Sequence, residues 1–140
     1  MASTTAMCTS FKVELLKGDH DFDVDTFKIA LIKSSPAGTY GAATTNYSDV
    51  TGNSDEVTGS GYTAGGNTLS VTTTPTSFGT TAFIDFADTV WSSATLTASA
   101  AIIYNTSLGN AAVAVLDFGG DKTSTNGDFT IQFPTADASN

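Results

Sequence analysis

The sequence predicts a mainly β protein, an antiparallel β-sandwich or barrel-like fold of about seven strands with one N-terminal α-helix. Three observations predict it. Apolar side chains alternate with a period of two in segments after residue 25, turn residues separate these short segments at regular spacing, and a helical period occurs once, near the N-terminus. The length of 140 residues corresponds to one domain, residues 1–140.

The helix is expected over residues 6–17. Met7, Phe11 and Leu15 recur at i, i+4 and i+8, which forms an apolar stripe that would pack on a sheet. Gly18 is placed to end the helix in a left-handed cap.

The first strand is expected over residues 26–33 (TFKIALIK), with Phe27, Ile29 and Leu31 on one face. Six more strands are expected, at residues 68–73, 81–86, 90–97, 99–105, 111–118 and 128–133. Turn signals separate them, at Pro75, Gly79, Asp88, 108–110, 119–120 and 126–127. Residues 105–110 predict a hairpin connection, and residues 119–127 (GGDKTSTNG) a loop between the last two strands.

Residues 34–66 form a long stretch rich in Gly, Ser, Thr, Asn and Asp, with a short helical turn expected near 44–50. Irregular loops of this length are uncommon in compact domains and are often functional. This loop and the N-terminal arm, residues 1–6, are the predicted contact segments. The last five residues (ADASN) are polar where a further apolar strand would be expected, which suggests a trimmed end.

The composition argues against several functions. The net charge is −9, and the chain has five Lys and no Arg, so phosphate-binding clusters are missing and a nucleic-acid partner is not expected. No apolar run approaches the ~20 residues of a membrane helix. The N-terminus does not have the pattern of a signal peptide, so a cytoplasmic site of synthesis is expected. Forty Ser and Thr residues would supply a neutral, hydroxyl-rich surface.

Candidates for metal or acid–base chemistry lie early in the chain. His20 is expected to be an exposed loop histidine rather than a base or ligand. Alternating acids at residues 19–25 resemble the start of a calcium loop, but Val24 and Ala30 stand where an EF-hand needs Gly and Glu. Two interpretations of residues 19–25 therefore remain: a nonstandard calcium site, or a solvated acidic edge that discourages strand pairing.

The remaining candidates favour structural roles. Asp117, Asp121 and Asp128 could form a glycosidase-like pair only if two of them faced a cleft. Cys8 is expected to be a small buried hydrophobic residue. Residues 59–69 (GSGYTAGGNTL) predict a turn or bulge rather than a phosphate loop, with the Tyr62 ring over the end of the sheet. The aromatic core is expected to contain Phe83, Phe86, Trp91, Tyr104, Phe118, Phe129 and Phe133.

Six strings are spread along the chain between residues 11 and 134: FKVELLKG, DTFKIALI, GYTAGGNTL, AFIDFADTVW, AAIIYN and AVAVLDFGGDKTSTNGDFTIQFP. In this combination the sequence resembles small virion structural proteins of tailed bacteriophages. The most specific part is GYTAGG followed by a Thr-rich strand and the LDFGGDKT segment.

The resemblance implies a β-rich component of the phage particle without enzymatic activity, cofactor, or catalytic, metal or cofactor-binding residues. The first interpretation is a capsid decoration (cement) protein that binds the major capsid protein, self-associates on the virion and is assembled in the host cytoplasm. A tail or fibre subunit is the alternative. A carbohydrate-binding or calcium-dependent adhesin domain comes third, and an enzyme last.

Overall fold

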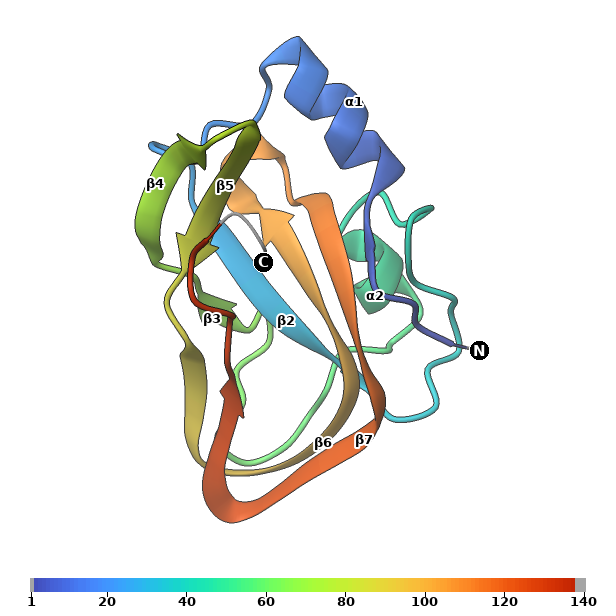
Figure 1. The fold of residues 1–140 in the computed structure, drawn as a ribbon. Helices are drawn as coiled ribbons and strands as arrows, with labels where there is room; N and C mark the ends of the chain where they lie inside the picture. Colours follow the sequence, from blue (N-terminus) through green and yellow to red (C-terminus); the bar gives the residue numbers. More distant parts are fainter. Residues whose placement is uncertain (1, 138–140) are drawn as a thin grey trace.

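A computed structural model describes residues 2–137; Met1 and residues 138–140, which include most of the polar tail, lie outside the described part. The predicted mainly β, antiparallel fold with an N-terminal helix is confirmed (Figure 1). One sheet has the strand order β1-β7-β6-β2-β3, and a two-stranded sheet contains β4 and β5. The larger sheet stays open, so the barrel-like variant of the prediction does not occur.

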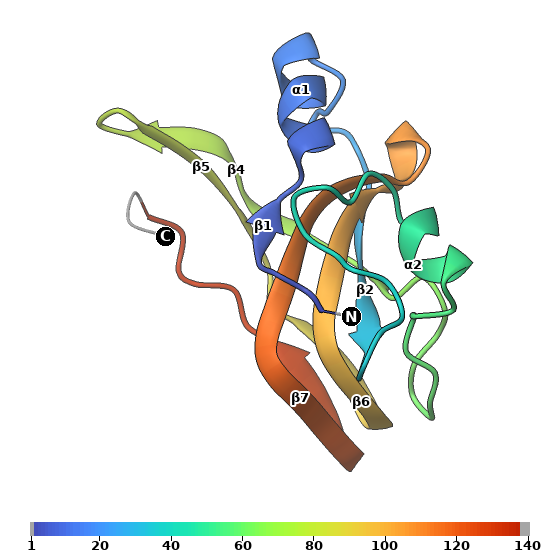
Figure 2. The ribbon, with the colours of Figure 1, turned by 90° about the vertical axis from the view of Figure 1, so that its right-hand side faces the viewer.

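Strand β2 (Phe27–Lys33) lies inside the larger sheet, between β6 and β3. The predicted face of Phe27, Ile29 and Leu31 is fully buried, and so are Ala30 and Ile32 on the other face. A strand buried on both faces needs a layer on each side of its sheet. In Figure 2 the 34–66 segment lies on one side of the sheet and the β4–β5 hairpin on the other.

The long hairpin of β6 (Thr89–Asn105) and β7 (Ala111–Ile131) replaces four predicted strands. The short 3-10 helix η1 (Thr106–Leu108) connects them, which confirms the predicted hairpin connection at residues 105–110. The predicted loop at 119–127 is wrong, because these residues continue β7, and Thr123 pairs with Thr97 of β6. Residues 118–121 bulge out opposite Ser99 alone, with Gly119 and Gly120 at positive φ. Such bulges let paired strands bend without ending.

The predicted strand at 68–73 is instead two elements, β3 (Asn67–Thr68) and β4 (Val71–Phe78). Pro75, predicted as a turn residue, lies within β4 where the register shifts. A proline is tolerated there because β4 has a neighbour on one side only. Strand β5 (Thr81–Phe86) has the predicted bounds.

Helix α1 spans Thr9–Lys17 and ends at Gly18, whose φ of 79° confirms the predicted left-handed cap. Residues 6 and 7 were expected in this helix but form strand β1 (Ala6–Met7), because they pair with Val115 and Ala114 of β7. Of the predicted stripe only Phe11 is buried, whereas Met7 and Leu15 are about half exposed, so the expected packing of the whole stripe is wrong.

The 34–66 segment is irregular as predicted, apart from isolated bridges and the short helix α2 (Ser48–Gly52). It contributes Tyr40, Val50 and Val57 to the core. Of the seven predicted core aromatics, Phe83 alone is absent from the core and its packed neighbours. The core also contains rings that the prediction missed, at Phe11, Phe27 and Tyr40, with Phe22, Tyr47 and Tyr62 packed against it.

None of the helices in residues 2–137 is long and apolar enough to cross a membrane.

Candidate interaction surfaces

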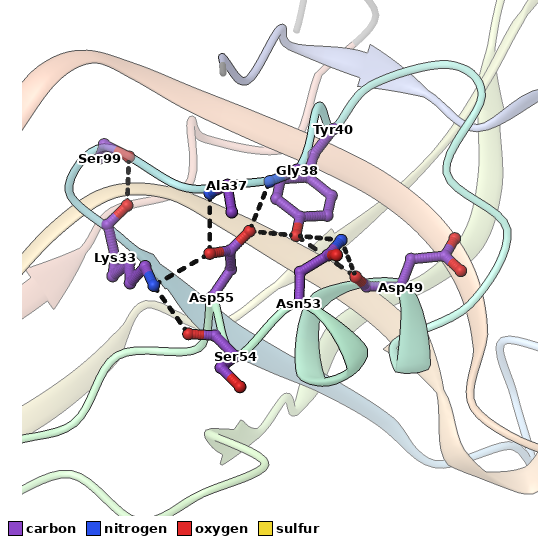
Figure 3. Close-up of polar contacts among 9 residues, drawn as sticks. All are labelled: Lys33, Ala37, Gly38, Tyr40, Asp49, Asn53, Ser54, Asp55 and Ser99. Atoms are coloured by element: carbon purple, nitrogen blue, oxygen red, sulfur yellow. Dashed lines mark hydrogen bonds and ion pairs between the residues drawn. The ribbon is translucent and has the colours of Figure 1, made fainter.

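The 34–66 segment is tied to the sheet by the carboxylate of Asp55, which is completely buried (Figure 3). Its oxygens accept hydrogen bonds from the Ala37 and Gly38 amides at 2.9 and 2.8 Å and from the Tyr40 hydroxyl at 2.6 Å. The Lys33 ammonium lies 3.1 Å away. Burial alone would raise the pKa of Asp55, but these donors hold it well below 3.8. The carboxylate therefore stays charged and fixes the loop on the end of β2.

Glu56 makes a second tie beside it. Its carboxylate accepts the Tyr47 hydroxyl at 2.5 Å, the Tyr62 hydroxyl at 2.8 Å and the Gly65 amide at 2.6 Å. The Tyr62 oxygen accepts in turn from the Leu31 amide of β2 at 3.0 Å. Burial, followed by the bond to Glu56, raises the pKa of Tyr47. Both ends of the segment are thereby joined to one strand of the sheet.

The N-terminal arm lies beside this segment in Figure 2. The Tyr40 amide donates to the carbonyl of Ala2 at 3.1 Å, and the Thr4 amide donates to the carbonyl of Tyr40 at 2.9 Å. Further along, the Thr9 amide donates to the carbonyl of Ala42 at 2.8 Å. The structure thus joins the two predicted contact segments in one surface, which we call the arm–loop surface (residues 2–7 and 34–66).

The arm–loop surface presents almost no free charge. Its charged side chains are Asp49, Asp55 and Glu56, and the last two are held in the networks described above. The Asp49 carboxylate accepts from the amides of Thr45 and Asn46 at 2.8 and 3.2 Å. The exposed positions are mainly Ala, Gly, Ser, Thr and Asn. A neutral surface of this kind can be covered by another protein without burying an unpaired charge.

The β4–β5 hairpin is a second candidate contact surface, which sequence reasoning missed. It projects from the body in Figure 2, and residues 71–84 carry no charged side chain. The pairs Thr76–Phe83 and Phe78–Thr81 place Phe78 and Phe83 on one face, where Phe78 is 75% exposed. Two-stranded hairpins are marginally stable in water without a further layer. The predicted Thr-rich strand indicated one strand of this hairpin. No pattern in the neighbouring sequence indicated that the hairpin would project from the body.

His20 corrects a sequence expectation, because its side chain is fully buried instead of exposed. The Asn105 amide nitrogen lies 3.0 Å from Nδ1 and 2.7 Å from an oxygen of Asp25, and can only donate to both. Nδ1 is therefore the acceptor, and Nε2 carries the hydrogen and donates to Glu14 at 2.8 Å. Both ring nitrogens are engaged, so His20 joins the end of α1 to the end of β6 instead of serving as a free base.

The acidic residues 19–25 form a turn, not an alternating strand edge. The Asp23 amide donates to Asp21 at 2.9 Å, and the Asp21 amide donates to Asp25 at 3.0 Å. The latter bond, followed by the one from Asn105, lowers the pKa of Asp25. Among residues 2–137 there is no group of three His, Cys, Asp or Glu side chains that could hold a metal ion.

Three later carboxylates are held by different segments. Asp121 accepts from the Ser34 hydroxyl at 2.5 Å, Asp128 from the Ser93 amide at 3.2 Å, and Asp117 from the Gly119 amide at 3.2 Å. Asp128 lines a groove of about 430 Å³ that includes neither of the other two. The structure therefore does not bring a glycosidase-like pair of these residues to one groove.

The glycine-rich residues 59–69 form turns that lead into β3, as predicted. Lys28 lies close to Gly65, which the sequence did not reveal. However, the Gly65 amide donates to Glu56, and the Gly66 amide donates to the carbonyl of Thr63 at 3.0 Å. Because both amides are engaged inside the protein, they are not available to bind a phosphate.

A second groove has a volume of about 550 Å³ and lies between residues 54–58, residues 95–97 of β6 and residues 123–125 of β7. Hydroxyl groups dominate its lining, and its ionisable side chains are Lys33 and Glu56. Lys33 is paired with Asp55, and Glu56 accepts hydrogen bonds from Tyr47 and Tyr62. No aromatic ring lines the groove, so it offers no stacking platform for a sugar.

Cys8 is completely buried, which confirms its predicted structural role. Burial, with smaller effects of nearby carboxylates, raises the pKa of its thiol to about 11 from an ordinary 9.0. We expect iodoacetamide at pH 8 to alkylate the native thiol at least about a hundredfold more slowly than the thiol in urea, since the thiolate is the nucleophile. Mass spectrometry of timed samples measures both rates; similar rates would contradict the burial of Cys8.

The chain was compared with family models, curated proteins and solved structures, and none of the three comparisons finds a match. A functional assignment therefore rests on the sequence resemblance, the fold and the surfaces described above.

Proposed function

We propose that this protein is a structural component of a tailed-phage particle, a capsid decoration protein that binds the head shell through the major capsid protein. The sequence resembles small virion structural proteins of tailed bacteriophages, and this resemblance suggests that the protein belongs to a phage particle. The observation that carries the proposal is the arm–loop surface, in which two segments far apart in the sequence meet and the charged side chains are held by internal hydrogen bonds.

The physical requirements of a decoration protein support this proposal. Such a protein acts by burying area against its neighbours, and stable interfaces bury about 1,200–2,000 Å² in total. The arm–loop surface supplies backbone and hydroxyl groups for hydrogen bonds. Covering this surface with a partner does not remove a free charged side chain from water. The Asp55 and Glu56 networks hold the segment in place before binding, which lowers the ordering cost on association. Many copies on one particle add avidity.

Deleting residues 34–66 would not test this function, because the segment carries the core residues Val50 and Val57 and the buried Asp55. A sharper test adds two charges to exposed positions of the surface, in the variant T39E/A43E. We expect this variant to keep its fold and to bind purified heads lacking the protein at least about tenfold more weakly, a loss of about 1.4 kcal/mol. Cosedimentation with the heads measures the affinity.

The matched control T130E/Q132E adds the same two charges at exposed positions of β7 and beyond it, and should bind like the wild type. Wild-type binding by T39E/A43E would contradict the proposed surface. If the wild-type protein binds tails and not heads, the tail-subunit alternative replaces the decoration role. Its density in a particle reconstruction would then lie on the tail.

A further inference from the structure

Helix α1 has an apolar stripe on its outer side that the fold leaves uncovered. Leu16 is 90% exposed and Val13 is 48% exposed. At 100° per residue these two side chains share one face of the helix, opposite the buried Phe11. The helix is therefore apolar on two sides, and the fold covers only one of them.

Two lysines flank this outer stripe. Lys12 and Lys17 are exposed, and neither forms an ion pair within residues 2–137. A surface of this kind, an apolar centre between two unpaired cations, is complementary to an apolar side chain between two carboxylates.

The turn that follows α1 presents that complementary surface. Val24 is 78% exposed, and the neighbouring Asp19 and Asp23 are also exposed. Asp21 and Asp25 are engaged by amides of the turn, whereas the carboxylates of Asp19 and Asp23 accept no hydrogen bond from the described part of the chain. Residues 9–25 thus carry two complementary surfaces, one on α1 and one on the turn, which do not contact each other within one molecule.

We propose that a second copy of this chain covers the α1 stripe, and that its residues 19–25 supply the contact. Val24 of one copy would lie against Val13 and Leu16 of the other, with Asp19 and Asp23 facing the two lysines. Helix α1 and the turn follow each other at one end of the molecule (Figure 1), so a two-fold axis at that end makes the contact reciprocal. Each dimer then contains the contact twice, and it closes without forming a filament.

This contact between copies is separate from the arm–loop surface, so its test and the head-binding test fail independently. Analytical ultracentrifugation of the full chain should show a monomer–dimer equilibrium as concentration rises to about 1 mM, a range in which weak contacts register. Exposed ion pairs are screened by salt, so the difference in dimer affinity between the wild type and K12D/K17D should shrink between low and high ionic strength.

Three variants test the contact itself. L16E, K12D/K17D and D19K/D23K should each remain monomeric at concentrations where the wild type dimerises. V90E adds a charge at another exposed apolar position, which is 43% exposed, and should dimerise like the wild type. Circular dichroism checks that every variant is folded.

The decisive experiment mixes K12D/K17D with D19K/D23K. In this mixture one contact has both charges reversed and the other is wild type, so both have opposite charges facing each other and the heterodimer should form. Sedimentation of the mixture as monomers would overturn the proposal. A wild-type protein that stays monomeric to about 1 mM, or an L16E variant that dimerises normally, would also overturn it.

Discussion

The free energy of unfolding of the D55N variant is expected to be about 2–4 kcal/mol lower than that of the wild type at pH 7, because buried donors lose a charged acceptor. The substitution preserves the size of the side chain but removes its charge, which leaves the Lys33 ammonium without its counterion. It also places an amide group where two carboxylate oxygens now accept hydrogen bonds from Ala37, Gly38 and Tyr40. At least one buried donor then loses its acceptor. Urea denaturation followed by circular dichroism measures the difference.

The same substitution should change how stability depends on acid. The folded protein holds the pKa of Asp55 below 3.8, so the charged carboxylate stabilises the fold. This contribution is fully present above about pH 3.8 and is lost as the pH falls toward the folded pKa. Between about pH 4 and pH 2 the stability of D55N should therefore fall less steeply than that of the wild type.

The matched control is D23N, because Asp23 is exposed and its carboxylate has no hydrogen-bond donor in the described chain. Its free energy of unfolding should change by no more than about 0.5 kcal/mol in dilute solution. Equal losses for D55N and D23N would contradict the role given to the buried network.

The G66A variant is expected to destabilise the fold by about 3 kcal/mol or more, since two costs add. A Cβ at this position would lie 1.9 Å from the Ile29 carbonyl oxygen and 2.7 Å from the Ala30 Cα, so the backbone must move. The φ of +70° also costs alanine about 1–2 kcal/mol. Moving Gly66 pulls β3 away from β2 and disturbs the Gly65 amide that donates to Glu56.

Gly79 provides the control that separates these two costs. Its φ is +60°, but a Cβ there would meet no atom within 4 Å. G79A should therefore lose only the conformational part, about 1 kcal/mol. Thermal or urea denaturation of both variants measures the contrast. If they lose the same stability, the close contact of Gly66 with β2 is not a constraint.

Several elements were predictable because their signals are local. The alternation in residues 26–33 identified the strand β2, and Gly18 marked the end of α1. The bounds of β5 were predicted residue by residue. In each of these segments, neighbours in the sequence are enough to determine the backbone conformation.

Other features were not predictable, because their partners lie far away in the sequence. Gly119 and Gly120 indicate a turn, yet they form a bulge because β7 keeps its pairing with β6 beyond them. Bulges and turns use the same residues, and only the pairing strand distinguishes them. Residues 6 and 7 follow a helical pattern but pair with β7 instead.

The candidate surfaces show the same division. The sequence identified the arm and the 34–66 segment as separate contact candidates, and the structure joins them at Tyr40. His20 between two aspartates suggested a solvated residue, but Asn105, which lies 85 positions later, bonds to its ring, and Phe11 and Phe27 pack against it.

By itself the sequence determined the mainly β class, the helix cap, the strand β2 and a hydroxyl-rich composition. Only the tertiary structure decided which charges are buried, which strands bend and which apolar side chains stay uncovered. Asp55 and Leu16 show why: a carboxylate is fully buried and a leucine is 90% exposed. Burial depends on which distant segments pack together, and local patterns do not contain that information.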